Sequence, residues 1–199
     1  MEPVRTVRGK AIPPDRPNVD TDQIIPAKHL KRIERSGYGP FAFEAWRAQP
    51  DFVLNNPVYD GARILISRQN FGSGSSREHA VWAIQGLGID ALIATSFADI
   101  FKGNCFQGGV LTIELADEDI DYLMARAEEL PESELVIDLE SQSVSTADGS
   151  WSRRFEIDPF RKYRLLRGLD DIGMTLAYER DVTAFEEERD DEAYPRTHT

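Results

Sequence analysis

The sequence predicts an α/β fold in which a mixed β-sheet is flanked by helices. Between residues 63 and 113, apolar runs typical of buried strands alternate with a helical pattern, an order that builds a parallel sheet through right-handed crossovers. Short strand-like segments follow between residues 136 and 157 and add antiparallel strands to the sheet. The length of 199 residues suits one full-sized domain with its own core.

Regular strand and helix patterns begin at about residue 63. Residues 1–26 hold five of the eleven prolines and show no helical period, so they predict loops and a short strand. The continuous apolar run Ile64–Ile66 is typical of a strand covered on both faces. A helical pattern begins at Ser75 and ends at Gly86 and Gly88. Its apolar face consists of Ala80, Ala83, Ile84 and Leu87.

The remaining elements follow from similar patterns. Ala91–Thr95 predicts a second buried strand, Pro131 closes a helix, and Asp148-Gly149 supplies a hairpin turn. The other expected elements are a short helix at 100–104, a strand at 110–113, a helix at 120–130, strands at 136–139, 143–145 and 151–157, and helices at 160–167 and 171–188. We expect one domain over residues 1–188 and an acidic, frayed tail at 189–199.

The charge balance narrows the classes of partner. With 23 basic and 35 acidic side chains, the net charge is −12, which argues against nucleic acid and anionic membranes. The sequence shows neither an apolar run of transmembrane length nor the apolar region of a secretory signal, so we expect a cytoplasmic protein. A basic cluster at residues 28–35 either collects a small anion or is a solvated polar segment.

The single cysteine, Cys105, limits the metal chemistry of the chain. It excludes an internal disulfide, and it excludes a metal or iron–sulfur site built only from this chain's thiolates, because such sites usually need three or four. With no neighbouring Cys or His, Cys105 is better interpreted as a small core residue.

The most informative stretch is Gly72-Ser73-Gly74-Ser75-Ser76-Arg77-Glu78-His79, between a predicted strand and a predicted helix. Its glycines allow close approach of a ligand to the main chain, the helix start favours an anion, and Arg77 matches a carboxylate or phosphate. The same residues fit a helix capping box, with Ser75 as N-cap and Glu78 three residues later, and need then have no function. We interpret His79 as a packed or capping residue.

Four stretches resemble, in order, the small subunits of 3-isopropylmalate dehydratases, which correspond to the swivelling C-terminal domain of the aconitase family. These stretches are Asn18–Pro26, Gly72–Ala80, Phe97–Asn104 and Gly168–Leu176. The resemblance implies a swivelling β/β/α domain and the interconversion of 2-isopropylmalate and 3-isopropylmalate through a dehydrated intermediate, in leucine biosynthesis. It also implies a [4Fe-4S] cluster carried by three cysteines of a large subunit, and none bound by this chain.

The resemblance further implies roles for single residues. Ser75 is the expected base, and Ser76 and Arg77 are expected to bind the substrate carboxylate. Asp22 belongs to the surrounding shell, although Asp20 and Asp22 are equally compatible with a turn. In the loop after Pro26, Lys31 stands where the family has an arginine, and Leu30 is the expected contact to the substrate's isopropyl group. Residues 38–41 are the expected mobile end of this loop.

Two alternatives stay open on the sequence. One is the small subunit of a related dicarboxylate hydro-lyase, of the homoaconitase or methylmalate type. The other is a non-catalytic anion-binding or regulatory module that uses the helix start at Ser75–Arg77.

Overall fold

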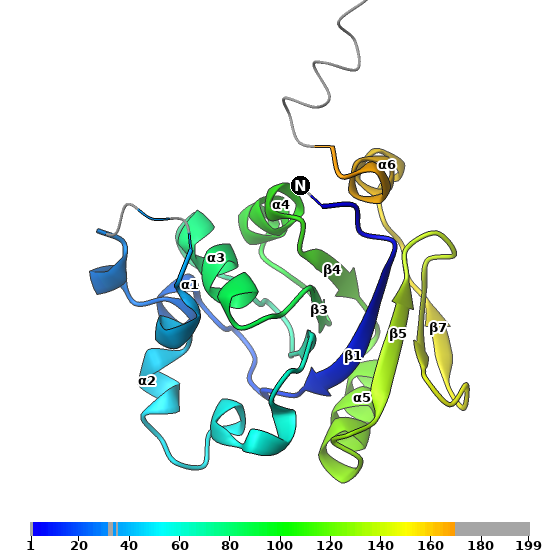
Figure 1. Cartoon of the computed structure of the whole chain (residues 1–199), viewed down its shortest axis with the longest axis horizontal. Coiled ribbons are helices and arrows are strands. Elements are labelled where there is room, and N and C mark those ends of the chain that lie inside the picture. The colour runs from blue at the N-terminus through cyan, green and yellow to red at the C-terminus, as the bar shows by residue number, and fades with distance from the viewer. Residues whose placement is uncertain (1, 32–33, 35, 170–199) are drawn as a thin grey trace, which may run out of the picture. The chain divides into compact units, whose positions relative to one another are not determined.

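A seven-stranded mixed sheet forms the centre of the computed structural model, which describes residues 2–31, 34 and 36–169 (Figure 1). The strand order is β4-β3-β2-β1-β5-β6-β7. Strands β1 to β4 are parallel to one another, whereas β1 pairs with β5, β5 with β6 and β6 with β7 in antiparallel fashion. The strands are β1 (Thr6–Ile12), β2 (Ile64–Ile66), β3 (Ala91–Ala94), β4 (Leu111–Glu114), β5 (Glu134–Asp138), β6 (Ser143–Thr146) and β7 (Ser152–Arg154). The predicted mixed α/β architecture is confirmed.

Alternating side chains of the parallel strands divide the core into two clusters. Leu65 and Leu92 pack with α3 (Glu78–Gly86) and α4 (Asp99–Gly108), whereas Ile64 and Ile93 pack with α5 (Asp117–Glu129). Because side chains alternate along a strand, these two sets lie on opposite faces of the sheet. The continuous apolar runs therefore identify strands with helices on both faces.

Most element predictions after residue 63 are confirmed, with shifted ends. The helix predicted at 100–104 extends over Asp99–Gly108, and the strand predicted at 151–157 covers only Ser152–Arg154. The helix α6 (Pro159–Arg167) has Pro159 in its first turn, where the missing N–H costs nothing, and Asp158 caps it. The predicted helix at 171–188 and the tail at 189–199 lie outside the described residues. The first compact unit of the chain ends at Gly168.

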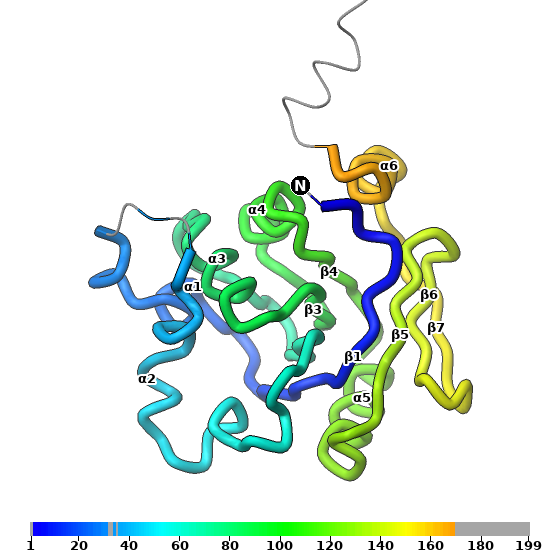
Figure 2. The backbone as a smooth tube through the Cα atoms, viewed as in Figure 1, coloured from blue at the N-terminus to red at the C-terminus, as the bar shows by residue number. Residues whose placement is uncertain are grey.

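The segment between β1 and β2 contains short helices that the sequence pattern does not reveal. They are α1 (Thr21–Ile24), α2 (Glu44–Arg47) and the 3₁₀ turns Ala27–His29, Gly39–Phe41, Val53–Asn55 and Pro57–Tyr59. Figure 2 shows this blue and cyan part of the chain passing beside α3. Helices of one turn are unstable alone, so tertiary packing must hold them. Ile24, Tyr38 and Phe43 are fully buried in the core cluster of α3.

Tyr38 and Gly39 anchor this segment directly to α3. The expectation that residues 38–41 form a mobile loop end is therefore wrong: the Tyr38 side chain is fully buried beside Trp82, and Gly39 is buried too. A Cβ atom on Gly39 would lie 2.1 Å from the carbonyl oxygen of Gly86, so only two glycines allow the two backbones to approach so closely.

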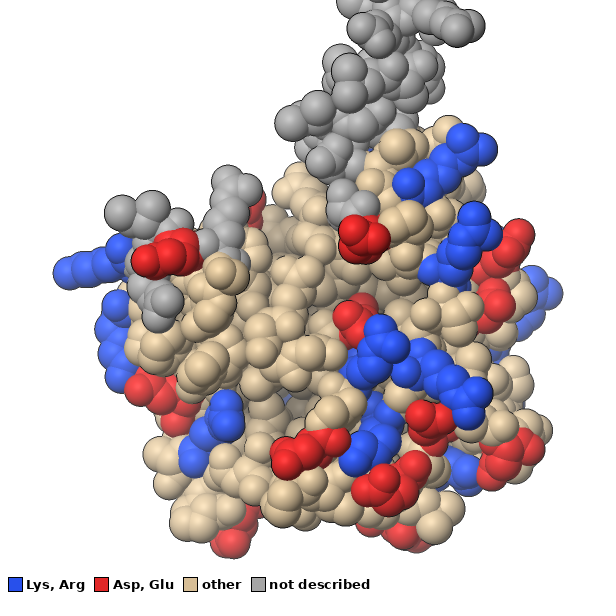
Figure 3. All heavy atoms as spheres, viewed as in Figure 1, with Lys and Arg blue, Asp and Glu red and all other residues tan. Residues whose placement is uncertain are grey.

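Charged side chains of both signs alternate on the face shown in Figure 3, over β1 and the antiparallel strands. Three of the ion pairs along the strands and at their ends are Arg8–Glu134, Lys10–Glu132 and Arg63–Asp90. Exposed pairs of this kind contribute little stability. Across the described parts of the chain, no helix is long and apolar enough to cross a membrane.

The Gly39–Gly86 contact predicts a large difference between two glycine substitutions in helices. Gly86→Ala places a Cβ 2.4 Å from the Gly39 nitrogen and should destabilise the protein by about 1–3 kcal/mol. Gly103→Ala, in α4, meets nothing within 4 Å and should stabilise it by about 0.5–1 kcal/mol through helix propensity. Urea denaturation of both variants measures the contrast, and equal effects would contradict the close contact.

Candidate active site

Residues 67–77, the serine-rich loop, follow β2 and cross the carboxyl ends of the parallel strands before α3 begins. Short bridges attach it on both sides: Phe71 pairs with Phe97 after β3, and Ser73 pairs with Asp20 before α1. The Gly72 N–H donates to the Val19 carbonyl at 2.7 Å. The sheet and the segment between β1 and β2 therefore position the loop together.

Gly72 is required by the packing of α4 beneath the loop. Its φ is +79°, and a Cβ would lie 2.1 Å from Cγ of Phe101. Any side chain would therefore collide with a fully packed aromatic ring as well as strain the backbone. Phe101 is buried among Phe71 and its neighbours, so the ring cannot move aside cheaply.

The capping box predicted at Ser75–Glu78 is absent. Helix α3 begins at Glu78, and its N-cap residue is Arg77, which makes no side-chain cap hydrogen bond. Within the described part of the chain, the Ser75 hydroxyl has no hydrogen-bond partner. A real capping box lies at α1, where the Asp20 carboxylate accepts from the Gln23 N–H and the Gln23 side chain accepts from the Asp20 N–H. Asp20 is therefore a structural residue.

A cavity of about 260 Å³ opens beside the loop. Gly74, Ser75, Ser76 and Arg77 line one side, and the start of α4 from Ala98 to Phe101 lines another, with Thr21 and Asn104 completing it. None of the main-chain N–H groups of residues 74–77 donates to a described residue. These N–H groups lie just before the first turn of α3, whose dipole adds positive potential, so this wall of the cavity favours an anion.

Arg77 and Asp22 form a two-pronged ion pair. Arg77 Nη1 and Nη2 donate to the two Asp22 carboxylate oxygens at 2.5 and 2.9 Å, and Nη1 also points to the Ile25 carbonyl at 3.5 Å. The Arg77 side chain is only 15% exposed, against 58% for that of Asp22. Because the guanidinium carries five N–H donors, it keeps donors for a second anion after binding Asp22.

The structure does not bring Leu30 and Lys31 to this cavity. Leu30 is half-buried against the core cluster of α3, and Lys31 is exposed. Within the predicted basic cluster, Lys28 forms an ion pair with the Glu44 carboxylate at 2.9 Å, and His29 Nε2 lies 2.8 Å from the same carboxylate. These contacts lower the pKa of Glu44, the hydrogen bond from Lys28 contributing most.

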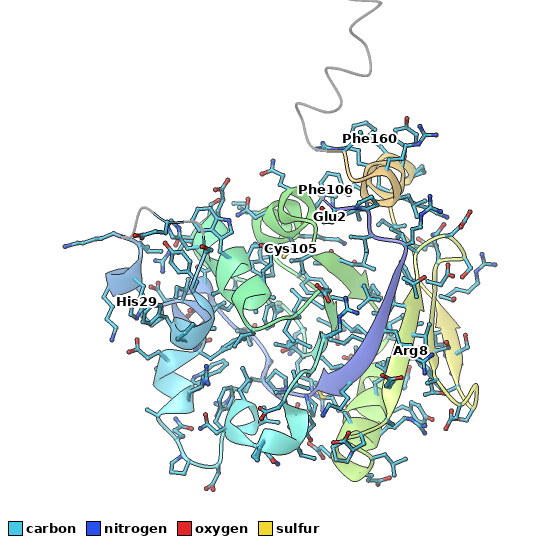
Figure 4. The ribbon with its side chains drawn as sticks, viewed as in Figure 1. Glu2, Arg8, His29, Cys105, Phe106 and Phe160 are labelled. Carbon is cyan, nitrogen blue, oxygen red and sulfur yellow. The ribbon has the colours of Figure 1, made fainter. Side chains whose placement is uncertain are left out.

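Two other predicted assignments are confirmed. His79 packs against the rings of Tyr38 and Trp82, and burial lowers its pKa. Cys105 lies on α4, as Figure 4 shows, and its thiol is fully buried, which raises its pKa. In the described parts of the chain, no three His, Cys, Asp or Glu side chains are close enough together to hold a metal ion.

Comparison with known proteins identifies the family. The model for the aconitase C-terminal domain matches residues 1–118, and a second model, LeuD_N, matches residues 121–159. The 3-isopropylmalate dehydratase small subunit of Rubrobacter xylanophilus is 55% identical over 95% of this chain and 96% of its own length. The chain belongs to the 3-isopropylmalate dehydratase small subunit family. The small subunit of Brevibacillus brevis, another member, is 50% identical over 95% of this chain and its entire length.

The fold of this family is also seen in a solved structure. The 3-isopropylmalate dehydratase structure from Methanocaldococcus jannaschii matches with a TM-score of 0.65 and 24% identity, covering 91% of this chain and 99% of that one. The names of the relatives support the main interpretation of the sequence and neither alternative. A small subunit implies a large-subunit partner.

The packing of His79 predicts a pH dependence of stability. Since the folded protein lowers the pKa of His79 from 6.5, the unfolded chain takes up the proton first as the pH falls. The neutral ring therefore contributes stability that is complete above pH 6.5 and lost as the pH falls through the lower, folded pKa. His79→Phe should show a smaller fall in Tm between pH 7.5 and 5.5 than the wild type, and an unchanged fall would contradict this origin.

Proposed function

We propose that this chain is the small subunit of a 3-isopropylmalate dehydratase that, with its large subunit, interconverts 2-isopropylmalate and 3-isopropylmalate by dehydration and rehydration. The reaction belongs to leucine biosynthesis, in the cytoplasm. Its strongest support is the 55% identity to a small subunit over nearly the whole of both chains. The cavity beside Ser75 supports it independently, since the substrates are dicarboxylates and the cavity wall favours anions.

Ser75 is the proposed base that removes the proton from the carbon next to a carboxylate. A serine hydroxyl is a weak base near neutral pH, so the site must stabilise its deprotonated form. The unpaired N–H groups of residues 74–77 and the nearby Arg77 guanidinium supply positive potential for this purpose. The absence of a cap hydrogen bond leaves the Ser75 oxygen available for proton transfer.

Ser76 and Arg77 are the proposed carboxylate-binding residues. Both line the cavity beside Ser75, and Arg77 retains free donors after its contacts with Asp22 and Ile25. Asp22 is proposed to hold the Arg77 fork in a fixed plane, which a lysine at position 77 would not provide. Asn104 approaches the Ser76 hydroxyl at 3.5 Å and belongs to the same wall.

Leu30 and Lys31 are proposed to contact the substrate's alkyl group and a carboxylate. They lie in the loop between α1 and the buried Tyr38 and do not line the cavity beside Ser75, so the proposed roles require them to meet the substrate in the assembled enzyme. Leu30 would distinguish isopropylmalate from smaller dicarboxylates by apolar contact, and Lys31 would provide a point charge.

The [4Fe-4S] cluster of the aconitase family is proposed to be held by the large subunit. The described residues of this chain do not fit such a cluster, because its one thiol, Cys105, is buried in the core with a raised pKa. We therefore assign to this chain only the proton transfer and the binding of substrate.

Co-expression with the cognate large subunit tests the proposed function. The purified pair should turn over isopropylmalate, and this chain alone should neither turn it over nor show cluster absorbance. A stable, partnerless chain that binds phosphate would favour the anion-binding module instead.

Ser75→Ala should lower kcat by several powers of ten in the assembled enzyme, because the base is lost. Its urea midpoint should stay near that of the wild type, since Ser75 does not cap α3. Ser152→Ala, on the exposed strand β7, is the matched control and should change neither. A kcat within tenfold of the wild type would show that the base lies elsewhere.

Leu30→Ala should raise KM for isopropylmalate more than for a malate analogue without the branched alkyl group. Loss of an aliphatic contact removes about 1–3 kcal/mol of discrimination. Steady-state kinetics on both substrates measures it, and equal losses would contradict Leu30 as the alkyl contact.

A further inference from the structure

We propose that Thr21 is a positioning residue for Ser75, fixing the backbone on both sides of Gly74 and so aiming the Ser75 side chain into the cavity. The inference rests on the proposed role of Ser75 as the base. It concerns a buried polar side chain that no sequence pattern singled out.

Thr21 makes two hydrogen bonds to the serine-rich loop. Its main-chain N–H donates to the Ser73 carbonyl at 2.9 Å, and its hydroxyl donates to the Ser75 carbonyl at 3.0 Å. The two acceptors flank Gly74, whose φ of +91° turns the chain between them. Thr21 therefore clamps a three-residue turn from one side.

Within the part of the chain that the structure describes, the hydroxyl of Thr21 is the one hydrogen-bonding group that holds Ser75. Neither the N–H nor the hydroxyl of Ser75 has a described partner, and α3 starts only at Glu78. Ser75 is exposed and follows a glycine, so the loop would otherwise have freedom to turn. The contact with Thr21 removes that freedom.

Thr21 is itself firmly held. It is 2% exposed and begins α1, which the Asp20–Gln23 capping box stabilises. Its carbonyl accepts from the Ile25 N–H at 2.9 Å, and Ile25 is fully buried. The clamp thus connects Ser75 to the buried core rather than to another loop.

Two substitutions separate the hydroxyl from the shape of the side chain. Thr21→Val keeps the volume and removes the donor, whereas Thr21→Ser keeps the donor and removes a methyl group. Small displacements of a reacting group cost up to about a hundredfold in rate. In the assembled enzyme we expect Thr21→Val to lower kcat about tenfold to a hundredfold with little change in KM, and Thr21→Ser to stay within about threefold of the wild type.

Thr146→Val is the matched control. Thr146 is equally buried, at 2% exposure, and its hydroxyl is also hydrogen-bonded, but it lies on β6 among the antiparallel strands. It should lower stability without affecting kcat. A kcat for Thr21→Val equal to that of the wild type would overturn the proposal, as would equal losses in the valine and serine variants.

Hydrogen exchange of the assembled enzyme provides a readout independent of turnover. Peptides that report the N–H groups of Gly72, Ser73 and residue 21, all hydrogen-bonded in the structure, should exchange faster in Thr21→Val but not in Thr21→Ser or Thr146→Val. Unchanged exchange in Thr21→Val would overturn the clamp. If the wild-type pair shows no turnover, the proposed function fails, and the exchange experiment still decides whether Thr21 holds Ser75.

Discussion

The candidate site depends on the contact between two segments that are distant in sequence, the start of α1 and the loop before α3. Arg77 and Asp22 join them by an ion pair, and Thr21 joins them by hydrogen bonds on either side of Gly74. Gly72 packs directly against the ring of Phe101 and so sets the distance between the loop and α4. Without these contacts, the loop would have no defined direction, because Ser75 lies outside any regular element.

The late start of α3 connects the fold to the chemistry. If Ser75 capped the helix, its oxygen would be occupied by a main-chain N–H and would compete with proton transfer. With Arg77 as N-cap, the loop instead presents N–H groups and a Ser75 hydroxyl that have no partner among the described residues. Without a side-chain cap, α3 is less stable by about 1 kcal/mol, but the N–H groups before it are available to bind an anion in the cavity.

Local patterns predicted the fold after residue 63 well, because the strands and longer helices there have clear periodicity. They failed between β1 and β2, where helices of one turn are held by burial of Tyr38 and Phe43 rather than by their own sequence. Ser75, Ser76 and Arg77 of the motif line one cavity, and their roles stay predictions. The motif also matched a capping box, in which Ser75 would cap α3, but the helix begins later. The sequence could not reveal this, since the positive φ of Gly74 and the contacts of Thr21 determine the path of the chain there. Thr21 itself was missed because one threonine in an irregular segment has no periodicity.

The burial of Cys105 gives the chain an internal reporter. Cys105 lies on α4, the helix whose Phe101 supports Gly72, and its thiol is fully enclosed where that helix packs against the core. A thiol reagent can reach it only when α4 separates from the core, so the rate of modification follows opening of the region that supports the serine-rich loop. Because the sequence holds one cysteine, that signal comes from a single position and needs no engineered label.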